Sequence, residues 1–200
     1  MRKAIVVLLA GALLASCTAS PQESNDGTAQ ETRVELDTPE LRKAKKQAGI
    51  EDCTPAKADP SDSLPDVTLA CLGGGPDVDL SRLRGPMVVN LFAQWCDPCR
   101  EELPYFQELH ERADGKVDVL GIDYLDTQPA AALELADYTG VTYPLLADPD
   151  GDVRVPLKVR GMPGTAFVDA DGTLVAVEYT VVESYDQLAD LVEEHLGVTV

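Results

Sequence analysis

Basic residues are scarce in this sequence. It has 16 lysines and arginines against 35 aspartates and glutamates, which gives a formal net charge of −19 at pH 7. Proteins that bind nucleic acid need a basic surface to neutralise the phosphates. We therefore expect no nucleic acid among the partners, and we interpret the acids chiefly as a solvated surface.

Histidine is scarcer still, because the chain holds 2 histidines, His110 and His195. Neither stands in a cluster of potential ligands. A closed zinc site takes about four ligands, commonly two cysteine pairs or one pair with histidines. We therefore expect no metal and no bound cofactor, although a metal-binding or adaptor module remains an alternative use of the cysteines.

The N-terminal apolar run is too short to cross a bilayer. It covers residues 4–15, AIVVLLAGALLA, whereas a membrane-spanning helix needs about 20 residues. Behind the basic head MRK, this run is typical of a secretory signal. The string LLASC that ends it resembles the lipobox of bacterial lipoproteins. The resemblance implies a signal peptide over 1–16 and lipidation of Cys17, with a plain signal peptide as the alternative.

We expect two further regions after the signal peptide. Residues 17–52 are mostly polar and predict a flexible, lipid-anchored tether. A short helix is possible within it, because Pro39 leads and Gly49 ends a helical stretch. Residues 53–200 form the expected folded domain.

Helical and strand patterns alternate through this domain. Short strand or edge segments are predicted at 66–72 and 77–83, and a hairpin at 164–179, where DADG is a strong turn signal. The other predicted elements are strands at 87–93 and 117–123, a strand followed by a turn at 143–151, and helices at 96–113, 129–140 and 184–196. The pattern predicts an α/β fold with a mixed central sheet and helices on both faces.

Two cysteines follow the apolar run 87–93 in the string QWCDPC. If Cys96 begins a helix, Cys99 lies one turn along it, and the two sulfurs can close a small disulfide ring. The helix N-terminus favours a thiolate at Cys96, whereas Cys99 would be the more buried, resolving thiol. Pro98 suits the first turn of such a helix. The spacing therefore predicts a redox-active dithiol.

The motif resembles the TlpA/ResA-like family of thioredoxin-fold proteins. The resemblance rests on LRGPMVVNLFAQWCDPCREELP, YPLLADPDG and GMPGTAFVDADG and covers about residues 64–196. It implies a membrane-tethered, extracytoplasmic thiol-disulfide oxidoreductase. It also implies a thioredoxin-like fold with an N-terminal extension and an insertion after the second core strand.

The resemblance also implies roles for individual residues. Cys96 matches the attacking cysteine and Cys99 the resolving one, and Trp95 matches the tryptophan before the motif. Pro163 matches a cis-proline that faces the disulfide. The backbone of Met162, next to it, would pair with an extended substrate segment.

Two acids near the dithiol have predicted roles. Glu102 lies one helical turn after Cys99, where a buried carboxyl with a raised pKa would exchange the proton of that thiol. An ordinary exposed glutamate is the alternative. Many cytoplasmic thioredoxins hold an aspartate on the preceding strand, where this chain has Asn90. Asp97, with Pro98, lies between the cysteines and tunes the potential, because its charge disfavours a Cys96 thiolate and so favours a reducing protein.

Cys53 and Cys71 form a second pair, separated by 18 positions. With Cys17 lipidated, four cysteines remain, an even number that suits an oxidising compartment. We expect a structural Cys53–Cys71 disulfide, worth about 3 kcal/mol in the chain-entropy model. A second redox-active pair is the alternative.

The expected function is reduction of disulfides in secreted client proteins, with electrons from a membrane donor. The resemblance implies that these clients include cytochrome c-type proteins. The opposite direction, oxidation of secreted thiols through a membrane acceptor, is the first alternative. A thiol peroxidase is another, but it requires threonine and proline around its cysteine, which QWCDPC does not provide.

Overall fold

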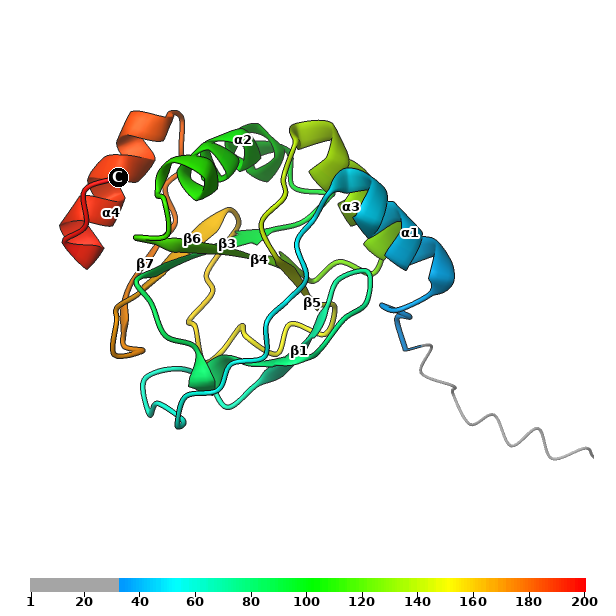
Figure 1. Cartoon of the computed structure of the whole chain (residues 1–200), viewed down its shortest axis with the longest axis horizontal. Coiled ribbons are helices and arrows are strands. Elements are labelled where there is room, and N and C mark those ends of the chain that lie inside the picture. The colour runs from blue at the N-terminus through cyan, green and yellow to red at the C-terminus, as the bar shows by residue number, and fades with distance from the viewer. Residues whose placement is uncertain (1–32) are drawn as a thin grey trace, which may run out of the picture. The chain divides into compact units, whose positions relative to one another are not determined.

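The computed structural model describes residues 33–200. These residues fold around a mixed sheet of seven strands (Figure 1). The predicted signal peptide, Cys17 and the first part of the predicted tether lie outside the described residues. The strand order is β2-β1-β5-β4-β3-β6-β7. The bounds are β1 Thr68–Cys71, β2 Val78–Asp79, β3 Met87–Phe92, β4 Asp118–Tyr124, β5 Leu145–Asp148, β6 Gly164–Val168 and β7 Leu174–Glu178.

The three central strands β3, β4 and β5 are parallel, and the outer strands run antiparallel to their neighbours. All of β3 is buried, as its continuous apolar run predicts. Val88 and Phe92 pack on one face of the sheet, whereas Val89 and Leu91 pack on the other. Each face therefore has its own apolar cluster.

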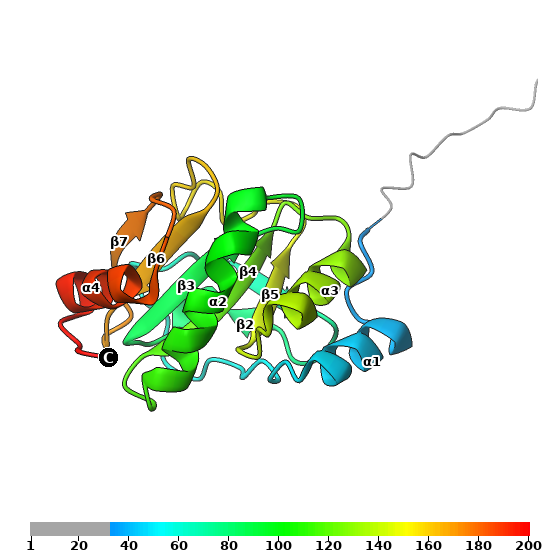
Figure 2. The same cartoon turned by 90° about the horizontal axis from the view of Figure 1, so that it is seen from above.

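The α-helices gather on one face of this sheet (Figure 2). Their bounds are α1 Pro39–Ala48, α2 Asp97–Arg112, α3 Pro129–Thr139 and α4 Tyr185–Leu196. All of them contribute to one apolar cluster and none to the other. The connections β3–α2–β4 and β4–α3–β5 step across the sheet in the same direction, so right-handed crossovers place both helices on the same face.

The opposite face is covered by irregular chain. Its cluster draws on segments within 53–83, which include the 3-10 helix η1 (Leu80–Arg82), and within 153–159. The thioredoxin-like mixed sheet that we expected is confirmed, but the expectation of helices on both faces is wrong for the α-helices. Helical periodicity reveals which residues are buried, but not on which side of the sheet they lie.

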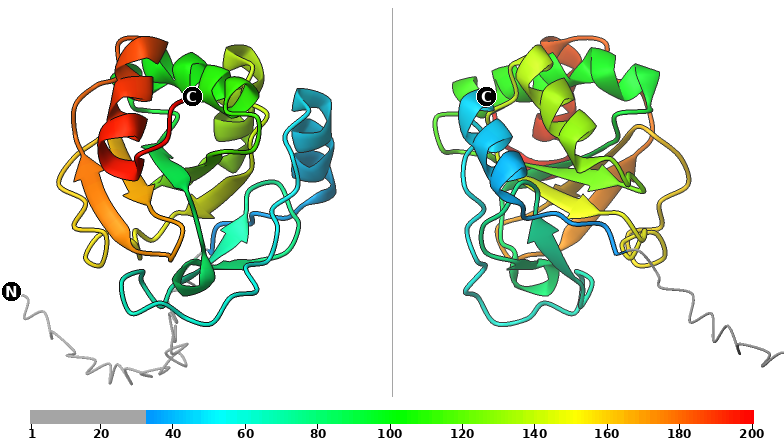
Figure 3. Two further views of the ribbon diagram at one scale, coloured as in Figure 1. Left: turned by 60° about the vertical axis from the view of Figure 1, so that its left-hand side comes forward. Right: turned by 90° about the vertical axis from the view of Figure 1, so that its right-hand side faces the viewer.

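Helix α1 belongs to the folded unit. The Oγ1 of Thr38 caps it by accepting a hydrogen bond from Leu41 N, and Gly49 ends it at a φ of 73°. Leu41 and Ile50 are buried in the apolar cluster on the helical face, and α1 lies beside α3 (Figure 3, right). Helix α1 therefore packs within the compact unit Arg33–Val200, although we expect the folded domain to begin at residue 53.

After β4, the chain passes through α3 and β5 before it returns to β6 on the far side of β3. These two elements occupy the place where we expect the family-type insertion. The hairpin β6–β7 and the closing helix α4 lie where the sequence predicts them. None of the helices within residues 33–200 has both the length and the apolar character needed to span a membrane.

Candidate active site

The two cysteines of QWCDPC form a disulfide at the start of α2. Cys96 is the N-cap residue of this helix, and Pro98 lies in its first turn. The Cα atoms of Cys96 and Cys99 are 5.3 Å apart. Cys96 keeps 5% of its surface exposed and Cys99 none, so the first sulfur is the more accessible of the two. This geometry matches the predicted order of attacking and resolving thiols.

The loop before Cys96 forms hydrogen bonds with the segment that follows β4. The backbone N–H of Gln94 donates to Oδ2 of Asp126 over 2.9 Å. The indole Nε1 of Trp95 donates to the carbonyl of Leu125 over 3.2 Å. Half of the Trp95 surface is exposed (50%), so this ring lies against the loop rather than in the core. These contacts fix the position of Cys96.

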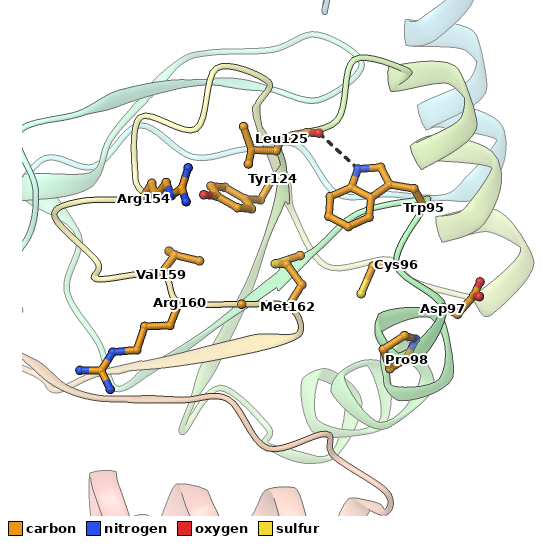
Figure 4. Close-up of a pocket in the computed structure, with 11 residues that line it drawn as sticks. Trp95, Cys96, Asp97, Pro98, Tyr124, Leu125, Arg154, Val159, Arg160 and Met162 are labelled. Carbon is orange, nitrogen blue, oxygen red and sulfur yellow. Dashed lines mark hydrogen bonds between the residues drawn. The ribbon is translucent and has the colours of Figure 1, made fainter.

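The loop before β6 approaches the same end of the sheet. Strand β6 pairs with β3 in antiparallel register, with Gly164 opposite Leu91. The peptide bond between Met162 and Pro163 is cis, as the resemblance implies. Met162 lines a cleft together with Cys96 (Figure 4). The structure thus brings Met162 beside Trp95 and Cys96, which lie far from it in the sequence.

This cleft has a volume of about 490 Å³. Trp95 and Leu125 form one wall of it, with Cys96, Asp97 and Pro98 at one end (Figure 4). The rest is lined by Tyr124, Arg154, Val159, Arg160, Gly161 and Met162. Within residues 33–200, no group of three histidine, cysteine, aspartate or glutamate side chains is placed to hold a metal ion.

Glu102 is fully buried on α2, one turn after Cys99. Its carboxylate accepts hydrogen bonds from Asn90 Nδ2 at 3.0 Å and from Val182 N at 3.1 Å. Burial raises the pKa of Glu102 to about 7, although both hydrogen bonds act in the opposite direction. The alternative of an exposed Glu102 is wrong, whereas its neighbour Glu101 is exposed.

Two polar groups near Glu102 were not assigned a role from the sequence. Asn90 is fully buried and holds the carboxylate, but its Oδ1 has no hydrogen-bond partner within residues 33–200. The hydroxyl of Tyr143 is also buried without a partner in that range. Burial and the charge of Glu102 raise the pKa of Tyr143 well above its ordinary value. Asn90 could have been singled out from the sequence, because it is the one polar residue in the apolar run MVVNLF.

Asp123 is a further buried acid that the sequence pattern did not indicate. It lies near the end of β4, opposite Phe92 of β3. Neither carboxylate oxygen has a hydrogen-bond partner in the described part of the chain. Burial, followed by the charge of Asp126, raises the pKa of Asp123 to about 9. Asp123 therefore carries a proton at neutral pH.

The expected disulfide between Cys53 and Cys71 is present. Their Cα atoms are 5.9 Å apart, and both residues are buried. The bond links the segment after α1 to the end of β1. The ammonium of Lys45, also buried, lies 3.1 Å from the Sγ of Cys71 and donates to the carbonyl of Gly74 over 2.9 Å. The disulfide and the Lys45 side chain together thus connect α1 and the loop 72–75 to the sheet.

Comparisons with known proteins agree with this architecture. Residues 60–177 match the family described as the AhpC/TSA family. The chain is 32% identical over 118 residues to the thiol-disulfide oxidoreductase ResA of Oceanobacillus iheyensis, an alignment that covers 56% of this chain and 61% of that protein. The chain thus spans about three fifths of the length of the curated relatives it matches first.

Two solved structures extend the comparison. MTB DsbF, in its mixed oxidized and reduced forms, superposes with a TM-score of 0.57 at 30% identity and covers 64% of this chain and 94% of its own. The exposed lipoprotein thioredoxin Etrx1 of Streptococcus pneumoniae superposes with a TM-score of 0.54 at 25% identity, covering 65% of this chain and 99% of its own. Because the family match spans more than half of the sequence, the chain belongs to the AhpC/TSA family, and its resemblance to TlpA/ResA-like proteins is confirmed.

Proposed function

We propose that this protein is an extracytoplasmic thiol-disulfide oxidoreductase that reduces disulfides in secreted or cytochrome c-type client proteins. The observation that carries the proposal is the Cys96–Cys99 pair at the N-terminus of α2, opening on a cleft beside the Met162–Pro163 loop. The relative from Oceanobacillus iheyensis is named a thiol-disulfide oxidoreductase, which supports the same chemistry.

In the first step, the Cys96 thiolate attacks one sulfur of a client disulfide. A mixed disulfide forms between Cys96 and the client, and the other client sulfur leaves as a thiolate that takes a proton from solvent. The positive end of the α2 dipole stabilises the attacking thiolate, because Cys96 sits at the N-cap with unpaired N–H groups around it. The small exposed surface of Cys96 is on the cleft.

In the second step, Cys99 attacks the Cys96 sulfur and releases the second client thiolate. Cys99 is fully buried, so its thiol needs a nearby group to accept the proton that it loses. The Glu102 carboxylate is that acceptor, because a pKa of about 7 leaves it partly ionised at neutral pH. Two electrons pass to the client, and Cys96–Cys99 is left as a disulfide.

The residues around the two cysteines bind the client and adjust the reduction potential of the dithiol. Met162 lies outside the strands and makes no backbone–backbone hydrogen bond within residues 33–200, so its backbone is free to pair with an extended client segment. Pro163 holds this loop beside the cysteines, and Trp95 offers an exposed ring on the cleft wall. Asp97 and Pro98 lie between the cysteines, where the charge of Asp97 disfavours the thiolate form of Cys96.

The proposal also includes the direction of electron flow and the location of the domain. A dithiol protein of the membrane would return Cys96 and Cys99 to the reduced state, whereas an oxidase would pass electrons to a membrane acceptor. Lipidation of Cys17 would tether the domain outside the cytoplasm. The likeness to the exposed lipoprotein thioredoxin Etrx1 supports this tether.

The reduction potential of the Cys96–Cys99 couple tests the direction. A potential near that of thioredoxin, about −270 mV, would support a reductase, and one near that of DsbA, about −120 mV, would indicate an oxidase. Replacing Cys99 with serine should trap the mixed disulfide with a peptide client, and replacing Cys96 should abolish it. If iodoacetamide modifies Cys96 no faster than a free cysteine at neutral pH, the mechanism fails.

A further inference from the structure

The cleft beside Cys96 has a charged end that the proposed mechanism does not use. Arg154, Val159 and Arg160 lie at the end away from Cys96, with Tyr124 and Met162 between them and the cysteine (Figure 4). The guanidinium of Arg154 lies beside Tyr124, whereas the side chain of Arg160 extends away from it. Both arginines are exposed. The carboxylate of Asp97 lines the cleft at the Cys96 end, so the two ends differ in the sign of their charge.

These two guanidinium groups differ from most arginines of the protein in having no partner. Within residues 33–200, the side chains of Arg42, Arg82, Arg84, Arg100 and Arg112 donate hydrogen bonds to carboxylates or carbonyls of the chain. Arg154 and Arg160 donate none in that range, and no carboxylate forms an ion pair with either. Among the described residues, Arg33 is the third arginine whose side chain has no such contact, but it lies outside the cleft.

Two free cations in a cleft are unusual on a chain with a net charge of −19. Intramolecular partners are plentiful, since acidic residues outnumber basic ones by 35 to 16. The arginines are therefore available to an external anion. Their positive charge attracts an anion at this end of the cleft, even though the net negative charge of the chain repels it at long range.

The shape of the cleft indicates what kind of anion this is. A volume of about 490 Å³ suits several residues of an extended segment better than a single small ion. The apolar wall of Trp95 and Leu125 and the backbone of Met162 continue from Cys96 to the arginines. A client cysteine that reacts at Cys96 would therefore place its flanking residues along this wall.

From this arrangement we infer that Arg154 and Arg160 select clients with an acidic side chain a few residues from the reacting cysteine. The inference rests on the proposed function, because it concerns the substrate of the same dithiol. The guanidinium forks suit a carboxylate, which can accept two parallel hydrogen bonds from one arginine. The arginines determine specificity and take no part in the exchange chemistry.

Kinetics with matched peptides test this inference. The full chain is given disulfide-containing peptides that differ only in glutamate or glutamine at successive positions on either side of the cysteine. We expect kcat/KM to be about fivefold higher for glutamate at the best position, as two exposed charge pairs allow. Added salt should reduce the preference. The double variant Arg154→Gln/Arg160→Gln should bring the ratio of the glutamate rate to the glutamine rate to about one.

The control is Arg33→Gln, which removes the same charge from an exposed, unpartnered arginine outside the cleft and should leave the preference intact. Equal rates for glutamate and glutamine at every position, with normal turnover, would overturn the inference and leave the proposed function standing. A preference for lysine peptides, or an equal loss of preference in the Arg33 control, would overturn it too. Failure to exchange with any peptide would overturn the proposed function and this inference with it.

Discussion

The Nδ2 atom of Asn90 donates a hydrogen bond to Oε1 of Glu102 over 3.0 Å, which joins β3 to α2. The strand leads into the cysteine loop, and the helix is capped by Cys96 and contains Cys99. The same carboxylate accepts from the backbone of Val182, just before α4. One buried acid on α2 thus connects this helix to two other segments near the dithiol, and the hydrogen bonds that these segments donate favour its charged form.

Replacing Glu102 with glutamine should slow the resolving step. With a pKa of about 7, Glu102 becomes a carboxylate as the pH rises through that value, so release of the client should accelerate over this range in the wild type. The variant should lose the inflection and resolve about tenfold more slowly or worse above it. Decay of a preformed mixed disulfide, followed between about pH 5 and 9, measures this step.

Glu101→Gln is the matched control for that experiment. It removes one glutamate from the same helix turn, but from an exposed position. Its pH profile should follow the wild type. If Glu102→Gln and Glu101→Gln behave alike, Glu102 takes no part in proton transfer.

Asn90→Ala should move the inflection to higher pH. The hydrogen bond from Asn90 lowers the pKa of Glu102 and so opposes the effect of burial. Without this bond the carboxylate is less favoured, and the midpoint should rise by about one unit or less. The pH profile of mixed-disulfide decay is measured as for Glu102→Gln. Each rate is divided by the plateau rate of the same protein, so that a loss of folded protein does not affect the midpoint. A midpoint that stays fixed or falls would contradict this role.

The cysteine chemistry was predictable from short sequence spacings, whereas the surroundings of Glu102 were not. The separation of Cys96 and Cys99 and the apolar run before them predict a dithiol at a helix start. The separation of Glu102 from Cys99 predicts which face it shares. The contact with Val182, however, joins residues 80 positions apart, and only the packing of α4 against α2 brings them together.

Burial of single polar residues was equally hidden. Helix α1 reads as a solvated helix because charged residues surround Leu41, yet that residue and the ammonium of Lys45 are buried. Asp123 ends an apolar strand run, where a sequence pattern cannot distinguish a buried acid from the first exposed residue of a loop. In both cases the neighbour that covers the residue comes from a distant part of the chain.

Removing the Cys53–Cys71 disulfide should reduce stability and spare the exchange chemistry. Both cysteines are buried away from the cleft residues, and the bond closes a loop over a separation of 18 residues. The double variant Cys53→Ala/Cys71→Ala should lose about 3 kcal/mol of unfolding free energy in urea. Peptide reduction at a temperature where the variant is folded should keep its rate. Lost turnover in a stable variant would instead favour the alternative of a second redox pair.

Asp123 should make the protein less stable as the pH rises. Its pKa is raised from 3.8 to about 9 in the folded state, so the native protein holds a proton that the unfolded chain releases between these values. Stability from this group is therefore complete below about pH 4 and declines as the pH rises toward 9, by at most about 1.4 kcal/mol per unit.

Asp123→Asn tests this directly, because asparagine keeps the shape and stays neutral at every pH. Urea unfolding of the oxidised protein should give similar free energies for variant and wild type near pH 4, and a more stable variant near pH 8, the difference growing with pH. Asp171→Asn, at an exposed turn, supplies the control and should leave the slope unchanged. Parallel pH curves for Asp123→Asn and the wild type would show that Asp123 ionises in the folded protein as easily as in the unfolded chain.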